Sequence, residues 1–533
     1  MGNTTEPWGL LREPYSESVK GNGSIPWSLT GPVVLLGAYC LLFTWSILFD
    51  CNLKFPVFGV KSPWEPVTVS YFRFFRSGET VLQEGYRACR DKVFQFRRAG
   101  TNMLVLPPQY VDDIRKLPSH VANPTVAHVH NLMGSSTNMD IILHNNLHFR
   151  TIQLKLTPNL SAVIQPMQDE LNFAIEHGLT KSEDEWVTIK PYHTVADFVA
   201  RVSARIFLGK SMCRNPEWLE VSTQFTENVF ISLVVLRLFP MWTHGLLNWF
   251  IPSSYKGSAY LRKAKKLLVP EILRRRERNS QGVNKPEGNN PDFLSWMMEI
   301  ATPEESDPIT LAHLEVVMSL ASNTSQMNAV QVLYDLLAYP EYLEPIREEI
   351  CSMVNEVGPW MSWGKLAFSK LQKLDSFMRE SQRFNPPTLL SMHRVILEEA
   401  VLSDGLVLPK GAHISMAVNA IQNDPEVTPK PKIFDGLRYY KLRQREDEAN
   451  FHQFSSTQDR ILHFGYGANA CPGRFFASLE IKIILVPLLM DYEFKLKHRD
   501  QRPKNLHAHE FIYTSPDAEI LMRRRPASER LEL

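Results

Sequence analysis

The stretch FGYGANACPGRFFA, from Phe464 to Ala477, constrains this chain more than any other. Its one cysteine, Cys471, stands among three glycines, with an aromatic residue seven positions before it and Arg474 three positions after it. Glycine lets a backbone approach a flat cofactor closely and adopt positive φ, and a thiolate in such a loop can bind iron. A buried free cysteine beside a turn is the alternative for an isolated cysteine. The pattern F-x-x-G-x-x-x-C-x-G-R-x-x-A fixes six positions, this cysteine included, which favours a cofactor loop.

Length and composition exclude some classes of protein. A chain of 533 residues suggests several domains on length alone. The formal net charge of +1 gives no reason to expect nucleic acid as a partner. The six cysteines are widely spaced and form neither a disulfide framework nor a C-x-x-C metal pair. A reducing compartment, and therefore a body that faces the cytosol, fits this pattern best.

An uncharged segment near the N-terminus predicts a membrane anchor. Residues 31–49 read GPVVLLGAYCLLFTWSILF, which is about long enough to cross a bilayer as a helix. A signal peptide fits less well, because about thirty residues precede the segment and no basic region abuts it. We therefore predict a lumenal tail over 1–30, a transmembrane anchor over 31–49 and a stiff, non-helical proline-rich hinge over 50–69, which precede the body of the chain over 70–533. A buried core helix is the alternative for residues 31–49.

The charges that flank this segment give a modest indication of orientation. Arg73 and Arg76 place more positive charge after the segment than before it, which favours a cytosolic C-terminal side. Glycosylation sequons begin at Asn3 and Asn22 and would be used only if the N-terminal tail is lumenal.

Two segments of the body have unusual composition. Residues 229–252 are very apolar, but Arg237 and Pro240 in the middle disfavour a second membrane span. A pair of helices that covers an apolar pocket or dips into a membrane surface fits better, with an ordinary core helix as the alternative. Residues 274–292 are rich in Gly, Asn and charge and predict an exposed loop, whose arginine run reads as a solvated helix end.

The remaining pattern predicts a mainly α-helical protein with small β-sheets. Apolar residues recur with helical spacing from Thr310 to Tyr339, and Pro340 ends the helix. The middle of this helix, residues 322–326, is polar, and buried polar groups cost free energy unless they are paired. Further helices are expected over 370–384 and 478–490, with short strands around 404–413. Too few strands alternate with helices for a doubly wound sheet.

An E-x-x-R pair precedes the cysteine loop. Glu380 and Arg383 share one face of the helix expected over 370–384, so that the two side chains can pair. Taken alone, such a pair is usually a surface salt bridge of little value. It is followed by the sequence FDGLR, which ends at Arg438 and lies between the pair and the loop.

The cysteine pattern resembles the haem-binding loop of the cytochrome P-450 family. The order of a long helix, E-x-x-R, F-x-x-x-R, cysteine loop and final helix is similar to that family over nearly the whole chain after the anchor. The resemblance implies a cytochrome P-450 fold, with a single large haem domain behind an N-terminal transmembrane helix. It also implies that Cys471 is the axial thiolate ligand of the iron of haem b, which favours O–O cleavage.

The resemblance assigns structural and cofactor-binding roles. It implies that Glu380, Arg383 and Arg438 form a buried network that holds the loop region in place. Arg394 is expected to pair with a haem propionate, because its fork can bond both carboxylate oxygens. The adjacent His393 is an alternative for this role, and a plain solvated arginine is the other reading. The other cofactor-binding residues of the loop are expected to be Phe464, which packs beside the thiolate, Gly467 and Arg474.

Thr324 matches the residue that, in the family, hydrogen-bonds dioxygen and relays protons. Asn323 then stands where an acid is usual, and an amide does not titrate near neutral pH. Acid-assisted proton delivery is therefore in doubt, with water, Ser322 or Ser325 as substitutes. The alternative is that this polar band simply bends the helix.

A second departure concerns the propionates. Asn469 stands two residues before the cysteine, where Arg or His is usual, and the family's W-x-x-x-R is not evident. In residues 143–150, Arg150 or a histidine could bind a haem propionate instead. His144 and His148, four residues apart, could in principle bind zinc, but no H-E-x-x-H or cysteine pair supports a zinc site.

The amino-acid sequence of the loop resembles that of microsomal fungal members that tailor secondary metabolites. This implies a monooxygenase of the endoplasmic reticulum membrane, single-pass, with the catalytic domain facing the cytosol. It would insert one oxygen atom of dioxygen into an apolar terpenoid, meroterpenoid or prenylated alkaloid. Electrons would come from NADPH through a partner cytochrome P-450 reductase that docks near the Cys471 face. Two alternatives stay open: a haem-thiolate enzyme that rearranges or dehydrates its substrate without net oxygenation, and a catalytically silent haem-binding paralogue.

Overall fold

The computed structural model describes residues 37, 40–41, 55–62, 65–98, 101–281, 292–497 and 501–530. The chain divides into two units, Met1–Asn52 and Leu53–Leu533, and almost all described residues belong to the second unit. The predicted anchor over 31–49 lies outside the described residues except for three positions, and the sequons at Asn3 and Asn22 lie outside them altogether. In the part of the chain that is described, no helix combines the length and the apolar character that a bilayer crossing requires.

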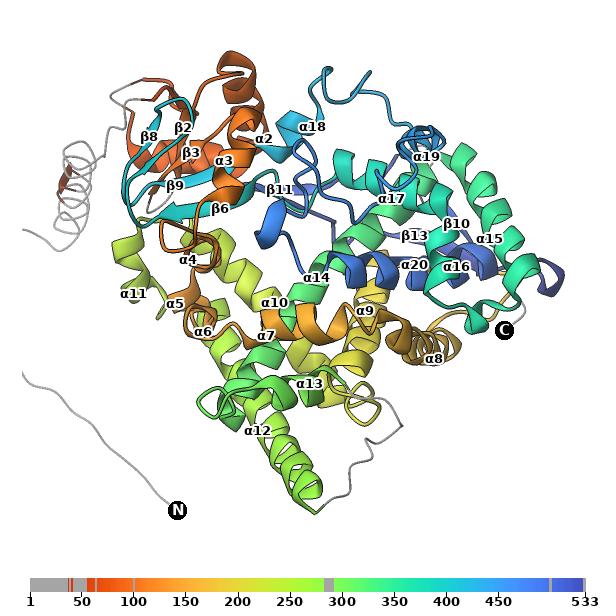
Figure 1. Ribbon diagram of the computed structural model, residues 1–533. Coiled ribbons are helices and arrows are strands. Elements are labelled where there is room, and N and C mark those ends of the chain that lie inside the picture. Colours follow the sequence, from red (N-terminus) through yellow and green to blue (C-terminus); the bar gives the residue numbers. More distant parts are fainter. Residues whose placement is uncertain are drawn as a thin grey trace, which may run out of the picture. The chain divides into compact units, whose positions relative to one another are not determined.

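The larger sheet joins strands from the first part of the second unit to two strands from residues 391–416 (Figure 1). Neighbouring strands pair antiparallel except for β1 with β2 and β3 with β9, which are parallel. The β3–β9 pairing aligns Leu104 with Ile414, so that distant parts of the sequence meet in this sheet. In spatial order, its six strands are β1 (Val57–Phe58), β2 (Phe94–Arg98), β3 (Thr101–Val105), β9 (His413–Met416), β6 (Ser391–Ile396) and β4 (Ala122–Asn123).

The helical part is organised around the long helix α14 (Pro308–Ala338). The side chain of Asp307 accepts a hydrogen bond from the Thr310 N–H, and Pro308 occupies the first turn, so that both local signals start the helix there. Pro340 follows its C-terminal end. Around α14 pack α9 (Pro191–Phe207), α10 (Pro216–Leu236), α12 (Pro252–Ser280), α17 (Gln372–Phe384) and α20 (Arg474–Asp491) (Figure 1).

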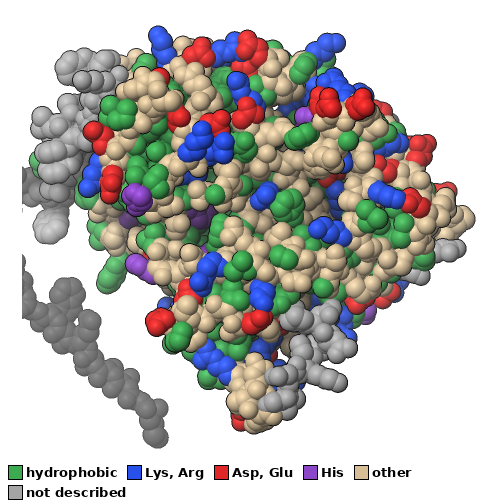
Figure 2. Space-filling view, viewed as in Figure 1, with side chains coloured by type: hydrophobic (Ala, Val, Ile, Leu, Met, Phe, Trp, Pro, Cys, Tyr) green, Lys and Arg blue, Asp and Glu red, His purple; other side chains and the backbone are tan. Residues whose placement is uncertain are grey.

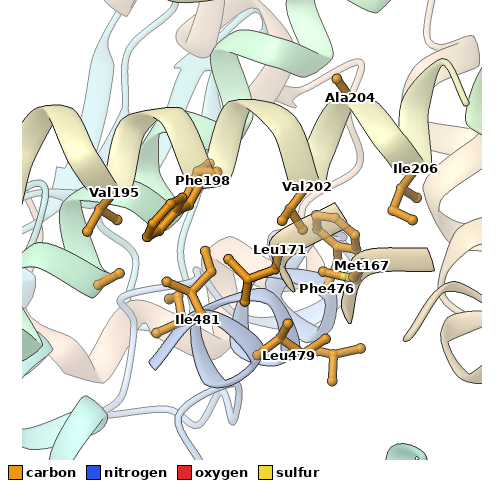
Figure 3. Packing of buried hydrophobic residues seen from close by; sticks show 14 of the residues in the cluster. Met167, Leu171, Val195, Phe198, Val202, Ala204, Ile206, Phe476, Leu479 and Ile481 are labelled. Carbon is orange, nitrogen blue, oxygen red and sulfur yellow. The ribbon is translucent and has the colours of Figure 1, made fainter. Parts of the chain in front are cut away.

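The main apolar core supports the helix that follows the cysteine loop. Figure 3 shows side chains of α9, among them Phe198 and Val202, pointing toward Phe476 and Ile481 of α20. Leu171, on α8 (Leu160–Gly178), fills the space between them. These side chains are almost completely buried. Burial of one such side chain stabilises the fold by about 1.5–3 kcal/mol, so the start of α20 rests on a rigid base.

Shorter elements complete this unit. Small sheets pair β10 (Tyr492–Leu496) with β13 (Ile520–Arg524) and β5 (Val187–Ile189), β11 (Leu506–Ala508) with β12 (Phe511–Tyr513), and β7 (Ala400–Val401) with β8 (Val407–Leu408). The other helices are α2 (Val67–Ala88), α3 (Val111–Lys116), α4 (Pro124–Asn131), α5 (Gly134–Thr137), α6 (Ile141–His144), α7 (Leu147–Thr151), α11 (His244–Leu247), α13 (Phe293–Ile300), α15 (Leu343–Val357), α16 (Lys365–Lys370), α18 (Val418–Gln422) and α19 (Arg438–Arg443).

The prediction of a mainly α-helical protein with small sheets is confirmed. The expected non-helical hinge over 50–69 ends earlier than predicted: Val57 and Phe58 pair with β2, and α2 begins at Val67, directly after Pro66. Proline is well tolerated where a helix begins, so it marks the start of α2 and does not prolong the hinge.

The structure also describes most of the two segments of unusual composition, residues 274–292 and 229–252. The loop expected over 274–292 begins later, because α12 continues to Ser280. Within it, Arg275 pairs with Glu271 one turn earlier and with Asp292 after the loop, which stabilises this last part of the helix. Over 229–252 the end of α10 and the short helix α11 form the predicted pair. Arg237, between them, is fully buried and pairs with Glu510 at 2.6 Å.

Candidate functional site

The cysteine loop is closed by backbone hydrogen bonds. The Cys471 N–H donates to the Phe464 carbonyl at 2.7 Å, and the Ala470 N–H donates to the Gly467 carbonyl at 3.1 Å. Gly467 has φ +77°, a left-handed conformation that favours glycine, and a Cβ atom there would lie 3.2 Å from the Cβ of Arg115. The sequence pattern therefore encodes a tight, pre-shaped loop that presents the Cys471 side chain.

Cys471 stands just before the N-terminus of α20. Cys471 is exposed, yet desolvation by the surrounding atoms raises the pKa of its thiol. The backbone N–H of Gly473 and the charge of Arg474 act in the opposite direction and favour the thiolate. A helix N-terminus also favours an anion. A bound metal cation would complete the stabilisation of a thiolate here.

Arg474 braces this loop. Its Nη1 donates to the Cys471 carbonyl at 2.8 Å, and its guanidinium lies 4.3 Å from the centre of the Phe475 ring. Asn469, the last residue of a short 3₁₀ turn (Gly467–Asn469), is exposed. The contact of Arg474 with a cofactor stays a prediction.

The polar band of α14 has one accessible face. Thr324 is exposed although the helix around it is mostly buried, and its hydroxyl donates to the Ala321 carbonyl at 3.0 Å. The Asn323 amide donates to the Gln326 side chain at 2.7 Å. The helix continues through this band from Pro308 to Ala338. An accessible hydroxyl within a buried helix is what a ligand-facing position requires.

Arg394 on β6 is a buried cation with unused hydrogen-bond donors. Its Nη1 donates to the His393 carbonyl at 2.7 Å, whereas Nε and Nη2 have no partner among the described residues. Burial lowers the pKa of Arg394 to about 10. Buried polar groups in folded proteins are normally hydrogen-bonded, and a carboxylate would satisfy both free donors in the manner typical of arginine. Arg394 therefore fits a haem propionate.

The predicted Glu380 network exists and is fully built from protein groups. Arg383 binds both Glu380 carboxylate oxygens, at 2.8 and 2.9 Å, and Arg438 Nε lies 3.2 Å from one of them. The Asp435 N–H donates to the same carboxylate at 3.1 Å. Glu380 and Arg383 are completely buried. Their geometry joins α17 to the segment around Arg438.

Asp375, one of the residues that sequence reasoning missed, connects this network to the cysteine loop. This buried carboxylate pairs with Lys482 of α20 at 2.6 Å, lies 3.7 Å from Arg443, and accepts a hydrogen bond from the Phe454 N–H at 2.8 Å. The Phe454 ring contacts the Phe464 ring edge-on, with centroids 5.4 Å apart. A signal was present in the sequence, because Lys482 interrupts a long apolar run in which an unpaired cation would be costly.

Other candidates for propionate or metal binding lie elsewhere. Arg150 pairs with Glu305, in the connection between α13 and α14, while its Nε has no partner among the described residues, so a contact between Arg150 and a propionate stays a prediction. His148 is neutral near pH 7, because burial lowers its pKa to about 4. Among the described residues, no three His, Cys, Asp or Glu side chains are grouped to hold a metal ion, which leaves the zinc hypothesis without support.

Comparison with known proteins agrees with this geometry. The family model described as cytochrome P450 matches residues 66–522. A cytochrome P450 monooxygenase, AN1598 of Emericella nidulans, is 42% identical over 495 residues, which cover 92% of each chain. Another, olcJ of Penicillium canescens, is 38% identical over 90% of this chain and 89% of its own. The ent-kaurene oxidase P450-4 of Gibberella fujikuroi is 35% identical over 92% of this chain and 97% of its own.

The residues that the family model matches span the loop, the long helix and the Glu380 network, and the family implies a haem iron cofactor that Cys471 and Arg394 are suited to hold. The chain belongs to the cytochrome P450 family and is a monooxygenase of that family.

Proposed function

We propose that this monooxygenase oxidises an apolar terpenoid, meroterpenoid or prenylated alkaloid in secondary-metabolite biosynthesis, with electrons from NADPH through a partner reductase. The observation that carries the proposal is the cysteine loop, whose closed backbone presents Cys471 at the start of α20. The name of one relative gives ent-kaurene as the compound oxidised, which supports a terpenoid substrate.

The haem, when bound, supplies the activation of dioxygen. Cys471 would ligate its iron, and Arg394 would hold a propionate through Nε and Nη2. Thr324, whose hydroxyl is accessible, would hold a proton for the reaction. One oxygen atom of dioxygen enters the substrate and the other leaves as water. The names of the relatives favour this oxygenation over a rearrangement without oxygen or a silent paralogue.

The test of the haem-thiolate centre is the carbon monoxide difference spectrum of the dithionite-reduced protein. We expect a thiolate-type Soret band in the wild type and in Cys351→Ala, which removes an exposed cysteine on α15. The band should vanish in Cys471→Ala. A wild-type protein that is folded and lacks the band would refute the proposal. Product formation should then require NADPH and the reductase. Turnover at the same rate without the reductase would favour the rearrangement.

We further propose that residues 31–49 anchor the chain in the endoplasmic reticulum membrane, with the catalytic part in the cytosol. An apolar surface on the connection between α10 and α12 supports a body that lies against a membrane. Trp249 is 83% exposed there, and Figure 2 shows hydrophobic side chains on the side where Figure 1 places α11. Its largest exposed side chains are Trp242, Leu246, Trp249 and Phe250.

Membrane extraction with carbonate tests the anchor. We expect the full chain to stay in the membrane pellet and a chain without residues 1–49 to be released at least in part. Glycosidase treatment tests the orientation, because a lumenal tail would carry sugar at Asn3 or Asn22. A mobility shift that persists in the double variant Asn3→Gln, Asn22→Gln would refute this topology.

A further inference from the structure

One peptide bond near the cysteine loop is held at both ends by charged side chains of α17. The Gln453 carbonyl accepts a hydrogen bond from Arg379 Nη1 at 3.1 Å, and the N–H of the next residue, Phe454, donates to Asp375 Oδ2 at 2.8 Å. Asp375 and Arg379 stand one helical turn apart, on one face of α17, and both are buried. Hydrogen bonds to charged groups are stronger than neutral ones. We call these two side chains and the peptide between them the peptide clamp.

The segment that carries this peptide has little regular structure of its own. Residues 444–466, all of them described, lie between α19 and the 3₁₀ turn Gly467–Asn469 and contain turns and one isolated bridge. Backbone groups that have no helix or sheet to bind them need other partners when they are buried. The clamp therefore contributes directly to where Phe454 lies.

Phe454 connects the clamp to the cysteine loop. Its ring is buried and meets the Phe464 ring edge-on, with centroids 5.4 Å apart, an arrangement that aromatic pairs prefer. The Phe464 carbonyl in turn accepts the hydrogen bond from the Cys471 N–H at 2.7 Å. Each step from α17 to Cys471 is thus a direct contact between two neighbours.

Asp375 also holds the chain on the other side of the cysteine. While its Oδ2 accepts the bond from Phe454, its Oδ1 pairs at 2.6 Å with Nζ of Lys482, on α20. Lys482 is buried as well, and its Nζ donates to the Phe368 carbonyl at 3.3 Å. One carboxylate therefore ties the segment before Cys471 to the helix that follows it.

We propose that Asp375 and Arg379 are positioning residues that keep Cys471 available as a thiolate ligand. They act through Phe454 and Phe464, because their printed contacts lead to these rings and not to the thiol itself. Without the clamp, the Phe454 ring is free to leave Phe464, and the loop gains arrangements that do not present Cys471. This inference rests on the proposed haem-thiolate function.

Two double variants isolate the bond from the Phe454 N–H. Both carry Lys482→Met, which removes the cation that loss of Asp375 would strand in the core. With it, Asp375→Asn keeps an oxygen that accepts the N–H, whereas Asp375→Leu has a similar shape and no acceptor. We expect the first to keep the wild-type share of the thiolate-type Soret band in the reduced carbon monoxide complex. In the second, the ratio of this band to that of haem without a thiolate should fall about tenfold, as expected for a buried donor left without a partner.

The other half of the clamp gives a second, independent pair of variants. Arg379→Lys keeps a cationic donor for the Gln453 carbonyl and for the Tyr439 ring, whose centre lies 4.2 Å from the guanidinium. Arg379→Met keeps neither. We expect the thiolate band to persist in Arg379→Lys and to fall in Arg379→Met, which keeps the test decisive if the Asp375 variants do not fold.

The midpoint potential of the haem iron is a further readout that stability alone would not change. A thiolate ligand donates electron density to the iron, so the potential should rise in the variants that lose the band. Glu170→Gln is the control for stability, because Glu170 on α8 is an equally buried carboxylate that pairs with Arg214 at 2.8 Å. It should unfold at a lower urea concentration than the wild type and keep both the band and the potential.

The outcomes separate the two proposals. A wild-type protein without the thiolate band would refute the haem-thiolate function itself. If the wild type has the band and the folded Asp375→Leu, Lys482→Met and Arg379→Met proteins keep it, the positioning role is wrong while the function stands. Equal losses in the Asn and Leu double variants would assign the effect to the ion pair with Lys482 and would also overturn the peptide clamp.

Discussion

Two regions of the molecule bury charge in opposite ways. Around Glu380, the carboxylate is bonded to two arginines and a backbone N–H, all supplied by this chain. At Arg394, a buried guanidinium keeps two donors without a protein partner. Burying an ion is costly unless other groups compensate it. The first region is complete within the protein, whereas the second leaves donors free that the proposed haem propionate would satisfy, so the two should respond differently to mutation.

Removing the Glu380 charge should have the largest effect on folding. In Glu380→Gln, Arg383 becomes a fully buried cation with its main partner weakened, so the free energy of unfolding should fall by about 3–5 kcal/mol. Urea unfolding followed by tryptophan fluorescence measures this loss. Glu426→Gln, in an exposed pair with Arg90, is the control and should change stability by less than about 1 kcal/mol. Equal losses in the two variants would remove the contrast between the regions.

The pH dependence of stability gives a second comparison, between the buried carboxyl groups of Glu480 and Glu510. Burial raises the pKa of Glu480 from 4.5 to about 7 in the folded protein, so its contribution is present at low pH and is lost as pH rises through that interval. Wild type should therefore lose roughly 3 kcal/mol of stability across it relative to Glu480→Gln, at 1.4 kcal/mol per pKa unit.

Glu510 should behave in the opposite way. Burial alone would raise its pKa, but Arg237 and Arg98 outweigh burial and lower it to about 2. Its contribution is present above its unfolded pKa and is lost as pH falls toward 2. Glu510→Gln should thus flatten the acid side of the stability profile and Glu480→Gln the neutral side. Denaturant titrations over a pH series measure both, and the same slope change in both variants would contradict the assigned charge states.

Arg394→Gln should weaken cofactor retention more than it weakens the fold. Its free donors contribute nothing to the protein alone, and loss of one charge-assisted contact to a propionate corresponds to about a tenfold faster loss of haem, or about 1.4 kcal/mol. Transfer of haem to an excess of apomyoglobin measures the rate. An unchanged rate of haem loss together with a large drop in the free energy of unfolding would mean that Arg394 is a structural residue, like those of the Glu380 network.

Arg150→Gln should have the smallest effect. Its pair with Glu305 is partly exposed, so stability should change by less than about 1 kcal/mol and the rate of haem loss should stay that of the wild type. A faster haem loss in the same transfer assay would indicate that Arg150 binds a haem propionate.

The sequence predicted features that are encoded locally. The glycines of the cysteine loop, the prolines at the ends of α14 and the E-x-x-R spacing on α17 can be read within a few residues. Asp375 and Glu480 were missed because their surroundings come from distant segments: Asp375 meets Lys482, and Glu480 meets Ser203. The pair of Arg150 with Glu305 could not be predicted for the same reason, because the two residues lie far apart in the sequence.

The strand order of the larger sheet has a consequence for how the chain is made. Strands β2 and β3 leave the ribosome early, but the partner of β3 is β9, in which Ile414 pairs with Leu104. Most of the polypeptide must be synthesised before this pairing can form, and closing so long a loop is slow. Until then the open edge of β3 can pair with other chains. The strand β3 is therefore an edge that stays open until late in synthesis.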